Sequence, residues 1–141
     1  MTTPTTLDSP AAVARAEERR SARIQDYASV VTPTSIAVSA SGRIAYVRTE
    51  ANPAADTNEH SIWLASPQLQ LTAGPADTSP AWHPVSTLLV FVRPDSSGTP
   101  QLWKVDATGG PATQLTTTAQ LPLGAGAPVF SPDGARIAFS A

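Results

Sequence analysis

Histidine and acidic side chains are the residues of this sequence that could move protons or bind a metal ion. The chain has two histidines, His60 and His83, and no cysteine. No third ligand stands at a recognisable spacing from them, so the sequence predicts neither a metal site nor a cofactor site. His60 precedes an expected strand and His83 adjoins Pro84 in an expected turn, so both are assigned structural rather than catalytic roles.

Five aspartates fall in expected loops or turns: Asp56, Asp77, Asp95, Asp106 and Asp133. Aspartate in a turn commonly accepts hydrogen bonds from nearby backbone amides. We therefore expect capping of local backbone in preference to acid–base chemistry. The sequence assigns no catalytic residue.

Tryptophan and arginine recur beside the expected strands. The tryptophans are Trp63, Trp82 and Trp103, and the arginines are Arg43, Arg48, Arg93 and Arg136. Core packing is expected of the tryptophans in preference to ligand stacking. The arginines are expected to lie along apolar surface or to pair between neighbouring sheets, and one of them could face a substrate chamber.

Composition excludes several classes of function. Of 141 residues, 41% are hydrophobic and 14% charged, and the net charge is -2. This balance provides no excess of basic side chains for a nucleic acid. No apolar run is long enough to span a membrane. Residues 1–9 lack the basic start and apolar core of a secretory signal, so we expect a cytoplasmic protein.

The chain divides into a polar N-terminal segment, residues 1–32, and a strand-rich remainder, residues 33–141. Ser9 and Pro10 form a helix-start signal. The stretch 11–27 is rich in helix-forming residues, and its four arginines are balanced by the four acidic residues of the segment 1–29. It is expected to be a solvated helix docked on a larger body; the alternative is a basic recognition helix.

From Pro33 onward the sequence consists of short apolar runs separated by turns, which predicts an all-β fold. The expected strands are 35–38, 43–47, 61–65, 69–72, 80–82, 88–92, 101–105, 113–116, 128–130 and 136–141. The run 88–92, Leu-Leu-Val-Phe-Val, does not alternate apolar and polar residues, so both of its faces should be buried. Ser131-Pro132-Asp133-Gly134 has the residues of a tight turn.

These runs repeat along the chain. Trp82 and Phe91 recur at Phe130 and Phe139 with the same spacing, and Gln70-Leu71-Thr72 recurs as Gln114-Leu115-Thr116. Each unit holds four strands in about 45 residues, which is typical of a β-propeller blade.

The units are expected at about 35–72, 78–116 and 126–141, the last with only its first two strands. We therefore expect an incomplete propeller of about two and a half blades, because a propeller needs at least four to close. Such a chain would leave one apolar blade face uncovered and is interpreted as the N-terminal piece of a longer protein.

The repeat resembles that of TolB-type propellers. Ser79-Pro80-Ala81-Trp82 carries the first half of the signature, and Phe130-Ser131-Pro132-Asp133-Gly134 with Ile137-Ala138-Phe139 carries nearly all of it. The middle unit departs, with Val85-Ser86-Thr87 in place of Asp-Gly. The order of features, with Asn58 to Ser61-Ile62-Trp63 as a link, resembles the acylaminoacyl-peptidase branch of the prolyl oligopeptidase family.

This resemblance implies a serine peptidase in which the propeller admits short peptides to an α/β-hydrolase domain that follows it. The nucleophile elbow Gly-x-Ser-x-Gly is not found here, and Gly124-Ala125-Gly126-Ala127-Pro128 contains no serine. No triad residue is carried over, so no peptidase activity is expected of these residues alone. Two alternatives stay open: a propeller that binds proteins without catalysis, and a decayed gene fragment.

Overall fold

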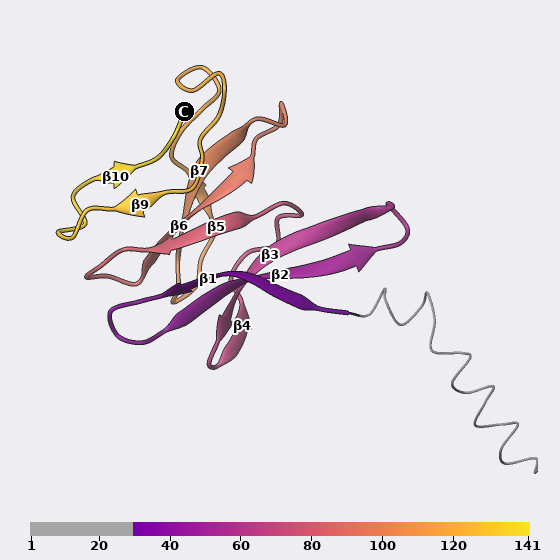
Figure 1. Ribbon diagram of the computed structural model, residues 1–141, viewed down its shortest axis with the longest axis horizontal. Coiled ribbons are helices and arrows are strands. Elements are labelled where there is room, and N and C mark those ends of the chain that lie inside the picture. The colour runs from indigo at the N-terminus through magenta and orange to yellow at the C-terminus, as the bar shows by residue number, and fades with distance from the viewer. Residues whose placement is uncertain (1–29) are drawn as a thin grey trace, which may run out of the picture.

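The computed structural model describes residues 30–141, which contain strands, turns and loops (Figure 1). The all-β prediction is confirmed for these residues. The helix predicted over 11–27 lies outside the described residues. Within residues 30–141 there is no helix of the length and hydropathy that a membrane span requires.

Residues 30–141 form ten strands in three antiparallel sheets, in each of which neighbouring strands follow one another along the chain. The first sheet holds β1 (Thr32–Val38), β2 (Ile44–Asn52), β3 (Thr57–Ala65) and β4 (Gln68–Gln70). The second holds β5 (Thr78–Trp82), β6 (Leu88–Pro94), β7 (Pro100–Asp106) and β8 (Thr113–Gln114). The third is the hairpin of β9 (Val129–Phe130) and β10 (Ile137–Ala138).

The hairpin turns form where the local residues favour them. In the third sheet, the Gly134 amide donates to the Ser131 carbonyl at 2.9 Å, and Gly134 has a φ of 74°. A positive φ is easiest for glycine, because it has no Cβ. In the second sheet, the β5–β6 turn closes without Asp-Gly, since the His83 amide donates to the Leu88 carbonyl at 2.9 Å.

Two apolar clusters hold the sheets together. The first lies between the first and second sheets and includes Ala45, Val47, Ile62, Leu64, Trp82, Leu89, Phe91 and Val105. The second joins the second sheet to the third and includes Val90, Val92 and Leu102, with Phe130 and Ile137 packed against them.

Strand β6 lies at the centre of both clusters. Leu89, Val90 and Phe91 are fully buried, and Val92 is 7% exposed. The prediction that this run is covered on both faces is therefore confirmed. Alternate side chains of one strand bind two neighbouring sheets, so β6 is the element on which the packing of the described residues depends.

Candidate functional site

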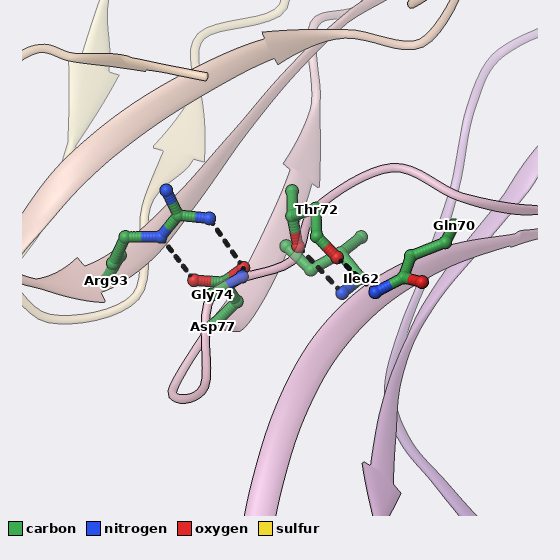
Figure 2. Close-up of polar contacts among 6 residues, drawn as sticks. All are labelled: Ile62, Gln70, Thr72, Gly74, Asp77 and Arg93. Atoms are coloured by element: carbon green, nitrogen blue, oxygen red, sulfur yellow. Dashed lines mark hydrogen bonds and ion pairs between the residues drawn. The ribbon is translucent and has the colours of Figure 1, made fainter. Parts of the chain in front are cut away.

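The best-defined polar site lies where the segment after β4 meets the second sheet. Asp77, directly before β5, is fully buried, and it faces Arg93 near the end of β6 (Figure 2). Arg93 donates from Nε to Oδ1 at 2.6 Å and from Nη2 to Oδ2 at 2.8 Å. This two-bond geometry between a guanidinium and a carboxylate is the strongest ion pairing that these side chains form.

The backbone around Asp77 is bound to the first sheet. The Asp77 amide donates to the His60 carbonyl at 3.0 Å, and the His60 amide donates to the Pro75 carbonyl at 2.8 Å. The Gly74 amide donates to Asp77 Oδ2 at 3.2 Å. Asp77 thus binds β3 through its backbone amide, and it binds the connecting segment and β6 through its carboxylate. We call this cluster of Gly74, Asp77 and Arg93 the junction.

Gly74 is part of the junction because of its size. A Cβ at this position would lie 2.6 Å from Arg93 Nε and would also overlap Asp77 Oδ1. Arg93 in turn lies 5.0 Å from the Trp103 ring and 5.2 Å from the Phe91 ring, measured from Cζ to the ring centroids. The guanidinium is therefore held between a carboxylate and two aromatic faces.

A second set of polar contacts lies at the end of the fourth strand in each of the two four-stranded sheets. In the first sheet, the Ile62 amide donates to Thr72 Oγ1 at 2.9 Å, and Gln70 Nε2 donates to the Thr72 carbonyl at 2.9 Å (Figure 2). In the second sheet, Leu102 donates to Thr116 Oγ1 at 2.9 Å and Gln114 donates to the Thr116 carbonyl at 2.7 Å. The repeated Gln-Leu-Thr sequence thus has a structural role.

The β6–β7 turn carries a third network, centred on Asp95. Hydrogen bonds from the Ser97 hydroxyl and then from the Thr118 hydroxyl lower the pKa of Asp95 to about 2. Ser97 Oγ donates to Oδ1 at 2.6 Å. Because Thr118 follows β8, this carboxylate connects a hairpin tip to the segment between the second and third sheets. Its role is to order two loops.

Sequence reasoning did not single out Gln101, which is fully buried beside this network. Its Oε1 accepts a hydrogen bond from Thr116 Oγ1 at 2.7 Å, and its Nε2 donates to the Leu121 carbonyl at 3.2 Å. The one feature of the sequence that could have indicated a buried amide is the position of this polar residue at the start of an apolar strand. Such a residue indicates a buried amide only once its partners are known.

The predicted turn caps are present at Asp106 and Asp133. The Thr108 hydroxyl is the main cause of a lowered pKa at Asp106, and the Ser131 hydroxyl is the main cause at Asp133. Each carboxylate also accepts a hydrogen bond from a backbone amide two residues later. Asp77 differs from the prediction: it caps Gly74, but its principal partner is a side chain from another strand, which only the folded chain brings near.

Neither histidine side chain is a partner of the junction's ion pair; each makes other contacts. His60 Nδ1 is 3.0 Å from Thr49 Oγ1 on the neighbouring strand. His83 Nδ1 accepts the Val85 amide at 3.3 Å, and its ring meets Phe130 edge-on at 5.1 Å. Within residues 30–141, no three histidine or acidic side chains gather in a way that could hold a metal ion.

A polar hollow of about 460 Å³ lies between the β1–β2 and β5–β6 turns. Its lining includes Ser39, Ser41, His83, Ser86 and Thr87. The His83 nitrogen nearest its own backbone already accepts an amide hydrogen, and none of the lining residues is acidic. No lining carboxylate is therefore placed to orient the His83 ring, as the activation of a hydroxyl in a catalytic triad requires.

An apolar surface covers the side of the first sheet that faces away from the second. We call it the outer face. A hollow of about 380 Å³ lies there, lined by Val31, Pro33, Ile36, Ile44, Tyr46 and Ala65. Ile36 is 67% exposed and Val38 is 62% exposed. Exposed branched side chains grouped on one sheet are typical of an interaction surface.

The chain is similar in sequence and in structure to known proteins. The chain is 31% identical over 100 residues to the uncharacterized peptidase YuxL of Bacillus subtilis, a match that covers 67% of this chain and 15% of that protein. Its sequence is related to that of a peptidase. No protein-family profile matches the chain.

The structure is similar to that of Pyrococcus horikoshii acylaminoacyl peptidase. The TM-score is 0.64 at 17% identity, over 79% of this chain and 17% of that protein. The chain therefore shares the fold of part of that enzyme and spans less than a fifth of both proteins. Together the two similarities support a relationship to a peptidase family.

Proposed function

We propose that these residues form part of a β-propeller in a serine peptidase of the prolyl oligopeptidase family. In this proposal the sheets are successive blades with TolB-type repeats. The propeller restricts access of peptides to an α/β-hydrolase domain elsewhere in a longer protein. Short peptides would be the substrates of that longer protein.

The observation that carries the proposal is the stacking of two equivalent four-stranded meanders about a shared apolar cluster. The third hairpin packs on the far side of the second sheet through a further apolar cluster. A series of sheets in which each covers the next is the arrangement of propeller blades. The relationship to peptidases gives this arrangement its proposed biological context.

The chemistry of the site supports a gating role in preference to a catalytic one. The junction's carboxylate is fully buried and already occupied by a guanidinium, so it is not available to a substrate. The polar hollow lacks an acidic lining residue. What the junction can do is fix the angle between two sheets, and a propeller that screens substrates by size requires sheets of fixed position.

The test uses the longer polypeptide encoded by the same gene, with and without Asp77→Asn. A fluorophosphonate probe would report a reactive serine, and hydrolysis of an acetylated dipeptide anilide would be compared with hydrolysis of unfolded casein. We expect labelling, hydrolysis of the short substrate, and a rise in casein hydrolysis when the junction is loosened. Asp133→Asn, in an exposed turn, is the matched control.

Two results would contradict the proposal. A longer product without a reactive serine would favour the alternative of a protein-binding propeller. The gating role would be contradicted if Asp77→Asn lowers the free energy of unfolding but leaves the ratio of short-peptide to casein hydrolysis unchanged.

A further inference from the structure

The β2–β3 hairpin of the first sheet is longer than the equivalent hairpin of the second sheet. The cross-strand pair of Tyr46 and Trp63 corresponds to that of Phe91 and Trp103. Beyond this pair, the second hairpin has three more residue pairs and the first has six. We call the additional part, residues 50–59, the arm; Figure 1 shows this hairpin extending past the beginning of β1. The arm has no counterpart in the second sheet, so the stacking of equivalent sheets does not account for it.

Hydrogen bonds within the arm fix its shape. Asn52 Oδ1 accepts the backbone amides of Ala54 and Ala55, each at 3.2 Å, which closes the tip. Asn52 Nδ2 donates to Glu59 Oε1 at 2.6 Å across the two strands. The Glu59 carboxylate is therefore held in place on the arm, although the residue is exposed to solvent.

The arm carries negative charge that the described residues only partly balance. Its charged side chains are those of Glu50, Asp56 and Glu59. Glu50 and Glu59 are direct partners across the two strands, an arrangement in which like charges destabilise a sheet. Arg48 forms an ion pair with Glu50, but within residues 30–141 no lysine or arginine pairs with Asp56 or Glu59. The arm thus presents two exposed carboxylates without a cation.

The chain enters the first sheet at the base of the arm. Thr32, the first residue of β1, pairs with Thr49, which directly precedes Glu50 on β2. Because β1 and β2 are antiparallel, the chain reaches Thr32 from the side on which the arm projects. Arg23 stands nine residues before Thr32, and nine extended residues span roughly 30 Å. The arm extends only about 10 Å beyond Thr49, so Arg23 can reach any part of it.

The N-terminal segment has the cations that the arm lacks. Arg15, Arg19 and Arg23 recur every four residues, in a part of the sequence outside the described residues. The helix expected over 11–27 would place these three side chains on one face. Like charges at this spacing destabilise a helix. Carboxylates against that face would relieve the repulsion in the helix and in the arm together.

We propose that the basic segment 11–27 docks on the arm of its own chain and places its arginines against Asp56 and Glu59. Two observations select this occupant: the complementary charge of the two parts, and the entry of the chain at Thr32 beside the arm. The contact holds the beginning of β1 against β2. It goes beyond the proposed function and does not depend on it, because both partners belong to these 141 residues.

The test locates the segment by paramagnetic broadening in NMR spectra of the 141-residue chain. The chain has no cysteine, so Ser21→Cys provides a single site for a nitroxide label. Spectra with the label oxidised and reduced give the broadening of each backbone amide. We expect the amides of residues 50–59 to be broadened severalfold more than those of the turn 131–136, which lies at the other end of the sheets (Figure 1).

The same measurement tests whether charge holds the contact. In about 1 M salt, which screens charges more than about 3 Å apart, broadening of the arm should fall to the level of the turn 131–136. Replacing Arg15, Arg19 and Arg23 together by glutamine should have the same effect. Glu17→Gln is the matched control and should leave the broadening intact, since the expected helix places Glu17 on the face opposite Arg19.

A charge exchange distinguishes docking from damage to the arm. Asp56→Lys with Glu59→Lys should abolish the broadening, and replacing the three arginines by glutamate in that variant should restore it. If the lysine variant fails to fold, the salt series and the glutamine variant decide, because neither alters the arm.

Three results would overturn the proposal. The first is broadening of the arm no greater than that of the turn 131–136, or equal broadening with and without salt. The second is broadening centred on residues 44–47 of the outer face, which would show apolar docking of the segment there. The third is broadening that arises only when labelled chains are mixed with separate isotope-labelled chains, because the segment would then dock on a second copy.

Discussion

Replacement of Asp77 by asparagine should weaken the fold more than any other single change from carboxylate to amide among the described residues. Asp77 is fully buried and accepts three hydrogen bonds, two from Arg93 and one from the Gly74 amide. Asparagine keeps one carbonyl oxygen but turns an NH₂ group toward a donor. The arginine then loses its only ion-pair partner among residues 30–141.

The size of the effect follows from the burial of the two partners. Removing one partner of a fully buried ion pair costs about 3–5 kcal/mol. Arg93 keeps 20% exposure of its side chain, so water can solvate part of the charge that Asp77 leaves. We therefore expect Asp77→Asn to lower the free energy of unfolding by about 2–3 kcal/mol, somewhat less than for a pair with both partners fully buried.

Urea unfolding followed by tryptophan fluorescence measures this change at neutral pH. Asp133→Asn, which removes a carboxylate from an exposed turn, is the control and should have a much smaller effect. Adding Arg93→Met to Asp77→Asn should recover part of the loss, because apolar side chains of similar length often replace buried ion pairs without penalty. A loss for Asp77→Asn no greater than that for Asp133→Asn would refute the reasoning.

Three further changes test neighbouring parts of the structure. Gly74→Ala should lower the free energy of unfolding by about 1–3 kcal/mol in the same urea assay, since its Cβ would displace Arg93; an unchanged midpoint would contradict this. Thr72→Val should remove the acceptor for the Ile62 amide, lower stability by about 1–2 kcal/mol and speed hydrogen exchange at that amide, measured by NMR. The depressed pKa of Asp95 stabilises the fold above the ordinary aspartate pKa, about 3.9, and this contribution should disappear as the pH falls toward about 2. Acid titration of unfolding should therefore be less steep over that interval in Asp95→Asn, and an identical profile would contradict the assignment.

Local sequence located most of the strands and turns among residues 30–141, but β2 continues to Asn52 and β3 begins at Thr57, beyond the expected runs 43–47 and 61–65. The run 88–92 could be assigned to a strand covered on both faces, because five consecutive apolar residues leave no polar face for water. The turn at Ser131-Pro132-Asp133-Gly134 followed from residues whose backbone preferences act within four positions. The helix expected over 11–27 falls outside the described residues.

The repeated Gln-Leu-Thr shows where sequence reasoning reaches its limit. Recurrence at Gln70 and Gln114 identified the motif as a structural unit. The role of the threonine could not be predicted, because its hydroxyl accepts a hydrogen bond from a backbone amide of the third strand, and only the folded sheet brings the two together. Sequence alone finds that such a motif repeats, because repetition is visible without a fold.

The partners of buried polar groups were decided by the tertiary structure. Asp77 and Arg93 are each ordinary in sequence, and nothing local distinguishes Asp77 from the aspartates that cap turns. Asp77 and Arg93 form an ion pair because the folded chain brings the segment after β4 against the end of β6. The packing of the first two sheets determines that approach. The same holds for Arg48, whose Nε is buried and has no hydrogen-bond partner among residues 30–141.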